Sequence, residues 1–399
     1  MLTSLALIFL VGLAMGAICQ RLKLPRIIGM LITGIVLGPY VLDFLDSSIL
    51  SISADLRKMA LIIILLKAGL SLDLNDLKKV GRPAIMLSFV PASFEIIGYV
   101  LLAPWILGIT CVEAAVMGAV LAAVSPAVVV PRMVNLMESK YGTEKAIPQM
   151  IMAGASCDDI FVIVLFTTFL SMAQGGNADV LDFVNVPVSI VLGILLGAVV
   201  GYGLYLFFET SYAHKHCVRN SMKVIIVLGV SFLIVAVEGW LEGKVAVSGL
   251  LAVVSMACVL KLKSTAFVSK RLSEKFGKLW IAAEVILFVL VGAAVDIRYT
   301  LQAGSAAIVM ILLALLFRAC GVLLCVAKTN LSWKERAFCV IAYMPKATVQ
   351  AAIGSVPLAA GLACGKIVLS VAVMAIIITA PLGAFGMDQT YRKLLHHEQ

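Results

Sequence analysis

Residues 147–170, IPQMIMAGASCDDIFVIVLFTTFL, form a long apolar stretch that carries two adjacent carboxylates, Asp158 and Asp159, at its middle. About 20 consecutive apolar residues are enough for a helix to cross the hydrocarbon core of a bilayer. Neither aspartate lies close enough to an end of the stretch for its side chain to reach an interface. The stretch therefore predicts a transmembrane helix with two acidic side chains near the middle of the membrane.

Similar apolar stretches recur through the whole chain, from Leu2 to Met387. Hydrophobic residues make up 62% of the 399 residues and charged residues only 13%, about half the charged fraction of an ordinary soluble domain. This composition excludes a solvated globule. We expect an all-α polytopic membrane protein with about 13 transmembrane helices. The predicted helices begin near residues 2, 27, 59, 83, 112, 146, 187, 221, 246, 279, 304, 335 and 366.

The positions of the basic residues predict which side of the membrane each loop faces. Most of the 31 lysines and arginines follow the odd-numbered predicted helices, and cytoplasmic loops carry the excess of these residues. We therefore expect a multi-pass protein of the cell membrane with its N-terminus outside and its C-terminus in the cytoplasm. The net charge of +9 does not indicate a nucleic-acid partner, because no basic stretch is interleaved with aromatic residues.

The predicted helices can be aligned as two inverted six-helix repeats, with the helix from residue 187 as a connector. Such repeats are typical of secondary transporters. In this alignment the helices from residues 112 and 335 correspond, and both contain prolines, in AVSPAVVVP (residues 123–131) and YMPKATVQAAIGSVP (residues 343–357). A proline frees backbone carbonyls, which membrane proteins tolerate where the backbone lines a cavity. The prolines predict crossed broken helices, although a simple kink remains the alternative for each.

The two aspartates predict a site at which a cation and a proton compete. Adjacent residues on a helix point about 100° apart, so Asp158 and Asp159 should have different roles. A hard cation such as Na⁺ prefers oxygen ligands, which these carboxylates and the freed backbone around Ser125 and Pro126 could supply. Burial favours the protonated carboxyl, so the same group could carry a proton instead. A purely structural role for the pair, in binding neighbouring helices, is the alternative.

Three further charged residues fall inside predicted helices, where charges are costly. Glu95 and Arg318 lie at the middle of corresponding helices of the two repeats, so we expect a buried ion pair with either a structural or a transport role. Lys346 follows Pro345 at the predicted break. Its ammonium could neutralise helix C-terminal carbonyls or pair with an aspartate when the cation is absent.

The ordered set of these motifs resembles the cation/proton antiporter superfamily, and within it the NHA group of sodium/proton antiporters. The matching stretches also include LPRIIGMLITGIVLGP (residues 24–39) and ILLKAGLSLD (residues 64–73), so the likeness spans nearly the whole chain. The resemblance implies a homodimer in which a six-helix core moves against a dimerisation domain in an elevator-like alternation. It also implies that Asp159 carries the ion or proton, with Asp158 as its partner. The residues that match the charged positions of the NHA pattern are Glu95, Arg318 and Lys346.

The resemblance gives a division of the chain into dimerisation helices, core helices and a linker. The dimerisation helices are expected in residues 1–80 and 216–300, the core helices in residues 81–175 and 301–399, and the linker helix in residues 176–215. One residue departs from the pattern, since electrogenic relatives with paired aspartates have a lysine where this chain has Arg318. Arginine does not lose its proton readily, so the charge moved per cycle stays open.

We therefore expect a secondary transporter that exchanges Na⁺ or Li⁺ for protons and has no cofactor beyond the transported ions. One alternative is a sodium-coupled solute symporter of the same fold, such as the bile-acid type. Another is an intramembrane aspartyl protease, but that chemistry needs two carboxylates that face each other across a water. Adjacent positions on one helix, such as Asp158 and Asp159, do not provide this arrangement.

Overall fold

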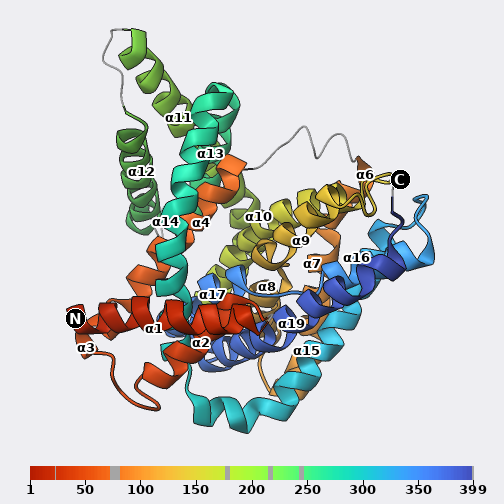
Figure 1. Cartoon of the computed structure of the whole chain (residues 1–399). Helices are drawn as coiled ribbons and strands as arrows, with labels where there is room; N and C mark the ends of the chain where they lie inside the picture. The colour runs from red at the N-terminus through yellow and green to blue at the C-terminus, as the bar shows by residue number, and fades with distance from the viewer. Residues whose placement is uncertain (23, 72–80, 176–179, 214–218, 242–246, 398–399) are drawn as a thin grey trace. The chain divides into compact units, whose positions relative to one another are not determined.

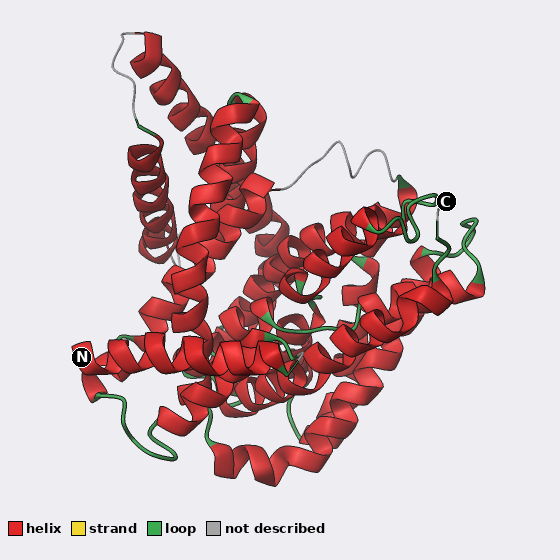
Figure 2. Ribbon diagram, in the orientation of Figure 1, coloured by secondary structure: helices red, strands yellow, loops and turns green. Residues whose placement is uncertain are grey.

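The computed structural model describes residues 1–22, 24–71, 81–175, 180–213, 219–241 and 247–397, and these are helical almost throughout. Figure 2 shows helices and loops and no strand in this part of the chain. An isolated β-bridge joins Tyr141 and His397. The prediction of an all-α fold is confirmed. The helices are α1 (Leu2–Arg21), α2 (Arg26–Leu37), α3 (Ser47–Ser51), α4 (Ser53–Ser71), α6 (Arg82–Leu87), α7 (Val90–Leu107), α8 (Cys111–Ala122), α9 (Pro126–Glu138), α10 (Ile147–Gln174), α11 (Val180–Ala213), α12 (Asn220–Leu241), α13 (Gly249–Lys263), α14 (Ala266–Ala293), α15 (Ile297–Cys325), α16 (Trp333–Ala342), α17 (Thr348–Ile353), α18 (Val356–Ala359) and α19 (Gly365–Leu394).

Nine helical stretches of the described residues are long and apolar enough to cross a membrane, so a multi-pass membrane protein is confirmed. They are Leu2–Arg21, Arg82–Leu107, Cys111–Glu138, Ile147–Gln174, Val191–Glu209, Asn220–Leu241, Phe267–Ala293, Gly304–Cys325 and Gly365–Leu394. Other apolar helices, such as the 12-residue α2 and the 15-residue α13, are shorter than a full crossing. The total of about 13 spans and the inverted repeat therefore stay predictions.

One predicted helix start is wrong. The helix expected from near residue 279 begins at Ala266, so the basic residues between Lys270 and Lys278 lie on the first turns of α14 rather than in a loop. Hydropathy places the start where the apolar residues begin. The charged residues before that point are themselves good helix formers, so the helix continues beyond the apolar stretch.

Two of the apolar stretches are interrupted at the predicted prolines. The helix α8 ends at Ala122, and α9 starts again at Pro126, which occupies a first-turn position where its missing N–H costs nothing. The helix α16 ends at Ala342, and α17 starts at Thr348. The two breaks contact each other directly, because the backbone N–H of Ser125 donates to the carbonyl of Pro345 at 2.8 Å.

The chain divides into two compact units, each described here by itself. The first comprises residues 1–54, 73–174 and 285–399, and the second comprises residues 55–72 and 175–284. In the first unit α7 packs between α8 and α15, while α8 also contacts α10 and α17 (Figure 1). In the second unit α13 packs against α11 and α12. The division into dimerisation and core helices stays a prediction, and its boundaries near residues 80, 176 and 215 lie outside the described residues.

Candidate ion-binding site

Asp158 and Asp159 lie in the middle of α10 and are both buried, with exposed fractions of 0% and 6%. The helix α10 packs against α8 and α9, so it runs past the break between them. This packing brings the aspartates to the interrupted backbone of residues 123–125. Apolar residues on either side of the pair keep α10 in contact with the interior of the first unit.

Asp158 has two partners. Its Oδ2 accepts a hydrogen bond from the backbone N–H of Val124 at 2.7 Å, and the Nη2 of Arg318 lies 3.3 Å from the same oxygen. Val124 belongs to the break, where a backbone N–H has no helical acceptor and needs another partner when buried. Asp158 thus supplies an acceptor to the broken backbone and a counterion to Arg318.

Asp159 has no such partner. In the described part of the chain no hydrogen bond or ion pair reaches its carboxylate, and its Oδ1 is buried without a hydrogen-bond partner. The difference follows from the helical geometry, because the two side chains leave α10 about 100° apart and only Asp158 faces the break and Arg318. The two carboxylates therefore have different environments, and the expected difference in their roles stays a prediction.

Glu95, Arg318 and Lys346 form one buried cluster, with side chains about 1% exposed. The Oε2 of Glu95 on α7 accepts from the Nη1 of Arg318 at 2.8 Å and from the Nζ of Lys346 at 2.6 Å. The structure thus contains the expected Glu95–Arg318 ion pair. The ammonium of Lys346 binds Glu95, and its two expected roles, toward helix carbonyls or toward an aspartate when the cation is absent, stay predictions.

Arg318 itself binds the carbonyls at the ends of two half-helices. Its guanidinium on α15 donates to the carbonyl of Ala122, the last residue of α8, and to that of Tyr343, just after α16. The C-terminus of a helix carries partial negative charge on carbonyls that lack a helical donor. One guanidinium therefore neutralises both helix ends at the crossing, a task for which its several donors suit it better than an ammonium.

Gln350, Thr348 and Thr379 complete the polar contacts at the crossing. These three residues were not identified in the sequence analysis. The Nε2 of Gln350 donates to the carbonyl of Ala123 at 2.8 Å, and its Oε1 accepts from the backbone N–H of Ala347 at 2.8 Å. The hydroxyl of Thr379 on α19 accepts from the N–H of Lys346 at 3.0 Å. A buried amide in the otherwise apolar stretch after Lys346 was the available signal for Gln350.

Ser125 and Pro126 lie at the start of α9, where the freed backbone was expected. Ser125 is fully buried, and its hydroxyl lies 3.5 Å from that of Thr348 across the crossing. Its N–H is already used by Pro345. No hydrogen bond joins Ser125 to either aspartate in the described part of the chain, so its role as an ion ligand stays a prediction.

Formal charges balance within this cluster except at Asp159. Two cations, Arg318 and Lys346, are paired with two carboxylates, Glu95 and Asp158. An ionised Asp159 would add one negative charge without a counterion, which is costly in a buried position. The arrangement can therefore hold one more positive charge, either a proton on the carboxyl or a cation beside it.

Comparison with known proteins places the chain in a family. It matches the family described as "Sodium/hydrogen exchanger, transmembrane" over residues 5–388. The human protein named sodium/hydrogen exchanger 9B2 is 35% identical over 375 residues, covering 90% of this chain and 68% of that protein. The human sodium/hydrogen exchanger 9B1 is 32% identical over 415 residues, covering 99% of this chain and 78% of that protein.

A solved structure shares the fold. The sodium proton antiporter MjNhaP1 from Methanocaldococcus jannaschii matches with a TM-score of 0.82 over 98% of this chain and 97% of that one, at 20% identity. The family match over residues 5–388 and the named exchangers confirm the resemblance to the cation/proton antiporter superfamily. They do not support the aspartyl protease alternative, because the relatives are named as exchangers. The chain belongs to the sodium/hydrogen exchanger family, whose members are membrane transporters rather than enzymes.

Proposed function

We propose that this protein exchanges Na⁺ or Li⁺ for protons, and that the two compete for the carboxylate of Asp159. The observation that carries the proposal is that Asp159 has no partner among the described residues, although it lies beside a cluster whose other charges are paired. A lone buried carboxylate is stable only when neutralised. A proton and a small hard cation both meet this need, and each excludes the other, so binding of one releases the other.

Asp158 has a supporting role in this mechanism. Its Oδ2 is held by Val124 and Arg318, which leaves the buried Oδ1 free as a second oxygen for a cation bound mainly by Asp159. The remaining ligands are expected from Ser125, from the backbone at Pro126 and from water. Because Asp158 also satisfies the broken backbone, its loss should change the shape of the site as well as its charge.

The same contacts favour movement of the core helices as one body. Glu95, Asp158, Arg318, Lys346 and Gln350 all fall in residues 81–175 or 301–399, the proposed core, and they connect α7, α8, α10, α15 and α17 through buried polar contacts. Buried hydrogen bonds and ion pairs that connect several helices resist the separation of those helices. This supports an elevator-like motion of the core against residues 1–80 and 216–300 of a homodimer. We propose further that it operates in the cell membrane with the N-terminus outside.

Transport measured in proteoliposomes tests the assignment of Asp159. We expect Asp159→Asn to abolish Na⁺-driven proton movement, because the amide can neither release a proton nor balance a cation. Asp158→Asn should reduce exchange, and it should also lower thermal stability, because Arg318 loses a counterion. The control is Glu138→Gln on the exposed end of α9, which should leave the rate unchanged. Normal exchange by a folded Asp159→Asn variant would show that the site is elsewhere.

A further inference from the structure

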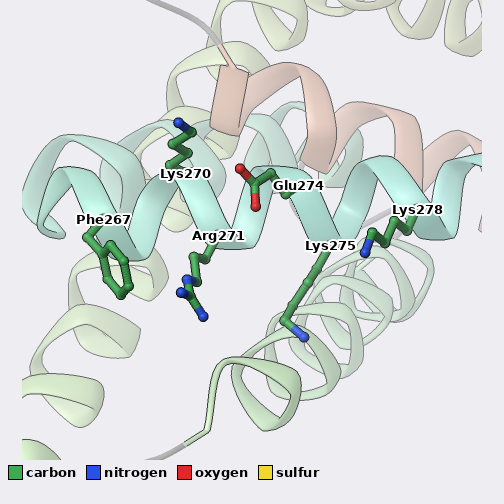
Figure 3. A pocket seen from close by; sticks show the side chains of 6 residues that line it. All are labelled: Phe267, Lys270, Arg271, Glu274, Lys275 and Lys278. Carbon is green, nitrogen blue, oxygen red and sulfur yellow. The ribbon is translucent and has the colours of Figure 1, made fainter.

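The first turns of α14 line a basic hollow of about 490 Å³ that is distinct from the buried aspartates and lies wholly in the second unit. Figure 3 shows its six lining side chains on this one helix. They comprise four cations, one carboxylate and one aromatic ring, namely Lys270, Arg271, Lys275, Lys278, Glu274 and Phe267. Taken with their formal charges, these residues give the hollow a net charge of three positive units at neutral pH.

Apart from Glu274 in the hollow itself, no carboxylate of the described residues lies close enough to neutralise its four cations. In the described part of the chain none of them forms an ion pair; Lys275 instead donates to the hydroxyl of Ser221 at 2.9 Å, and the guanidinium of Arg271 lies 4.5 Å from the ring centroid of Phe267. Two other basic residues do have acidic partners, in the pairs Arg132–Asp388 at 3.0 Å and Lys145–Glu335 at 2.9 Å. The hollow therefore keeps its charge available to an anion from outside.

Apolar groups beside these cations indicate what kind of anion fits. The membrane-spanning stretch of α14 starts at this point, and Leu279 and Ile281, 38% and 49% exposed, continue from the hollow along the helix. Phe267 is 63% exposed. Cations at the level of lipid headgroups, flanked by exposed apolar side chains that can contact acyl chains, match an amphipathic anion better than a free one.

We propose that the hollow defined by Phe267, Lys270, Arg271, Glu274, Lys275 and Lys278 binds the headgroup of an anionic phospholipid. The phosphate would be held by the cations, while Glu274 and the modest volume limit the site to one headgroup. The acyl chains would lie along α14 beyond Lys278. Binding of this kind is electrostatic in part and should weaken as the salt concentration rises.

The test measures lipid affinity of the purified full chain in an uncharged detergent, from the thermal unfolding midpoint during titration with phosphatidylglycerol or phosphatidylcholine. The test variant is Lys270→Gln/Arg271→Gln/Lys278→Gln, which keeps Lys275 and its bond to Ser221. Each basic residue near a headgroup contributes roughly fivefold to affinity, so we expect about a 100-fold weaker response to phosphatidylglycerol. The matched control, Lys334→Gln/Arg392→Gln/Lys393→Gln, removes the same charges from exposed positions in the other unit and should respond as the wild type.

A charge-preserving variant tests whether the loss of response comes from misfolding, and a soluble anion tests whether phosphate alone can bind. Lys270→Arg/Arg271→Lys/Lys278→Arg should retain the response, which distinguishes loss of the site from misfolding. Inorganic phosphate at the same concentrations should neither raise the midpoint nor compete with the lipid. The proposal is overturned if phosphate replaces the lipid, if phosphatidylcholine acts equally, or if the test and control variants lose the same affinity. None of these results depends on exchange activity, so the lipid site and Asp159 are tested separately.

Discussion

Arg318 makes more contacts than any other side chain of the candidate site, and the shape of its guanidinium explains why. It contacts Glu95, Asp158 and the carbonyls of Ala122 and Tyr343. A lysine would keep the charge but could not reach these acceptors together. We therefore expect Arg318→Lys to lower the free energy of unfolding by about 2 to 4 kcal/mol, because buried acceptors lose their donors.

A second arginine provides the matched control for this prediction. Arg132 makes a bidentate contact with Asp388 at 3.0 and 3.1 Å, but this pair is partly exposed to solvent. Exposed pairs contribute little, so Arg132→Lys should cost less than about 1 kcal/mol. Thermal or denaturant unfolding of both variants in the same detergent measures the difference. Equal effects of the two substitutions would mean that the buried contacts of Arg318 do not stabilise the fold.

The charged residues of this site were predictable one by one, but of their pairings only that of Glu95 with Arg318 was. Burial cost alone identifies Glu95, Asp158, Asp159, Arg318 and Lys346, since each interrupts an apolar stretch. The partners depend on how helices distant in the sequence cross. For that reason the sequence could suggest Lys346 for the helix carbonyls, whereas Arg318 binds them and Lys346 binds Glu95. Asp159 is distinguished from Asp158 only by the absence of such contacts.

At the scale of the elements, α10 lies so close to the break between α16 and α17 that it needs a small residue at position 154. A Cβ added at Gly154, one turn before Asp158, would overlap the hydroxyl of Tyr343 and crowd the Cβ of Leu87. The carbonyl of Tyr343 is a partner of Arg318, so displacement of this residue would disturb the charge cluster. We expect Gly154→Ala to slow exchange about tenfold through a small distortion of the crossing.

A glycine without close neighbours controls for the effect of alanine on a helix. Nothing lies within 4 Å of a Cβ added at Gly229 in α12. Gly229→Ala should leave exchange unchanged and stability within about 1 kcal/mol, since alanine favours helix. Exchange rates of the two variants in proteoliposomes, with circular dichroism as a check on folding, measure the contrast. If Gly154→Ala exchanges at the normal rate, the close approach of Gly154 to Tyr343 does not affect transport.

The breaks were the elements that the sequence predicted best, and the start of α14 the one that it predicted worst. Pro126 and Pro345 lie at the interruptions, as the missing backbone donor of proline predicts, whereas Pro131 lies inside α9 without ending it. The hydropathy pattern predicts only the apolar part of α14. It does not predict the turns from Ala266 to Lys278, which carry the basic hollow. The positions of the two breaks were therefore predictable from the sequence. The start of α14 was not, because it lies before the apolar stretch.

At the scale of the whole molecule, the charge balance of the cluster predicts how exchange responds to a membrane potential. Arg318 and Lys346 are each bound to buried carboxylates, and in the described part of the chain neither forms a salt bridge with Asp159. If these pairs persist in both orientations of the core, the only group whose charge changes is Asp159. One Na⁺ would then replace one proton, and the carrier would have the same net charge with either ion.

We therefore expect electroneutral exchange. In proteoliposomes with a K⁺ gradient and valinomycin, the initial rate of Na⁺-driven proton movement should be the same at an imposed potential of either sign. Moving one net charge per cycle would instead add or remove roughly 2.3 kcal/mol per 100 mV of driving force, which is enough to separate the two polarities clearly. The Asp159→Asn variant in the same vesicles gives the background leak. A rate that follows the potential would mean that Lys346 or Arg318 leaves its carboxylate during the cycle and pairs with Asp159, so that a second charge moves.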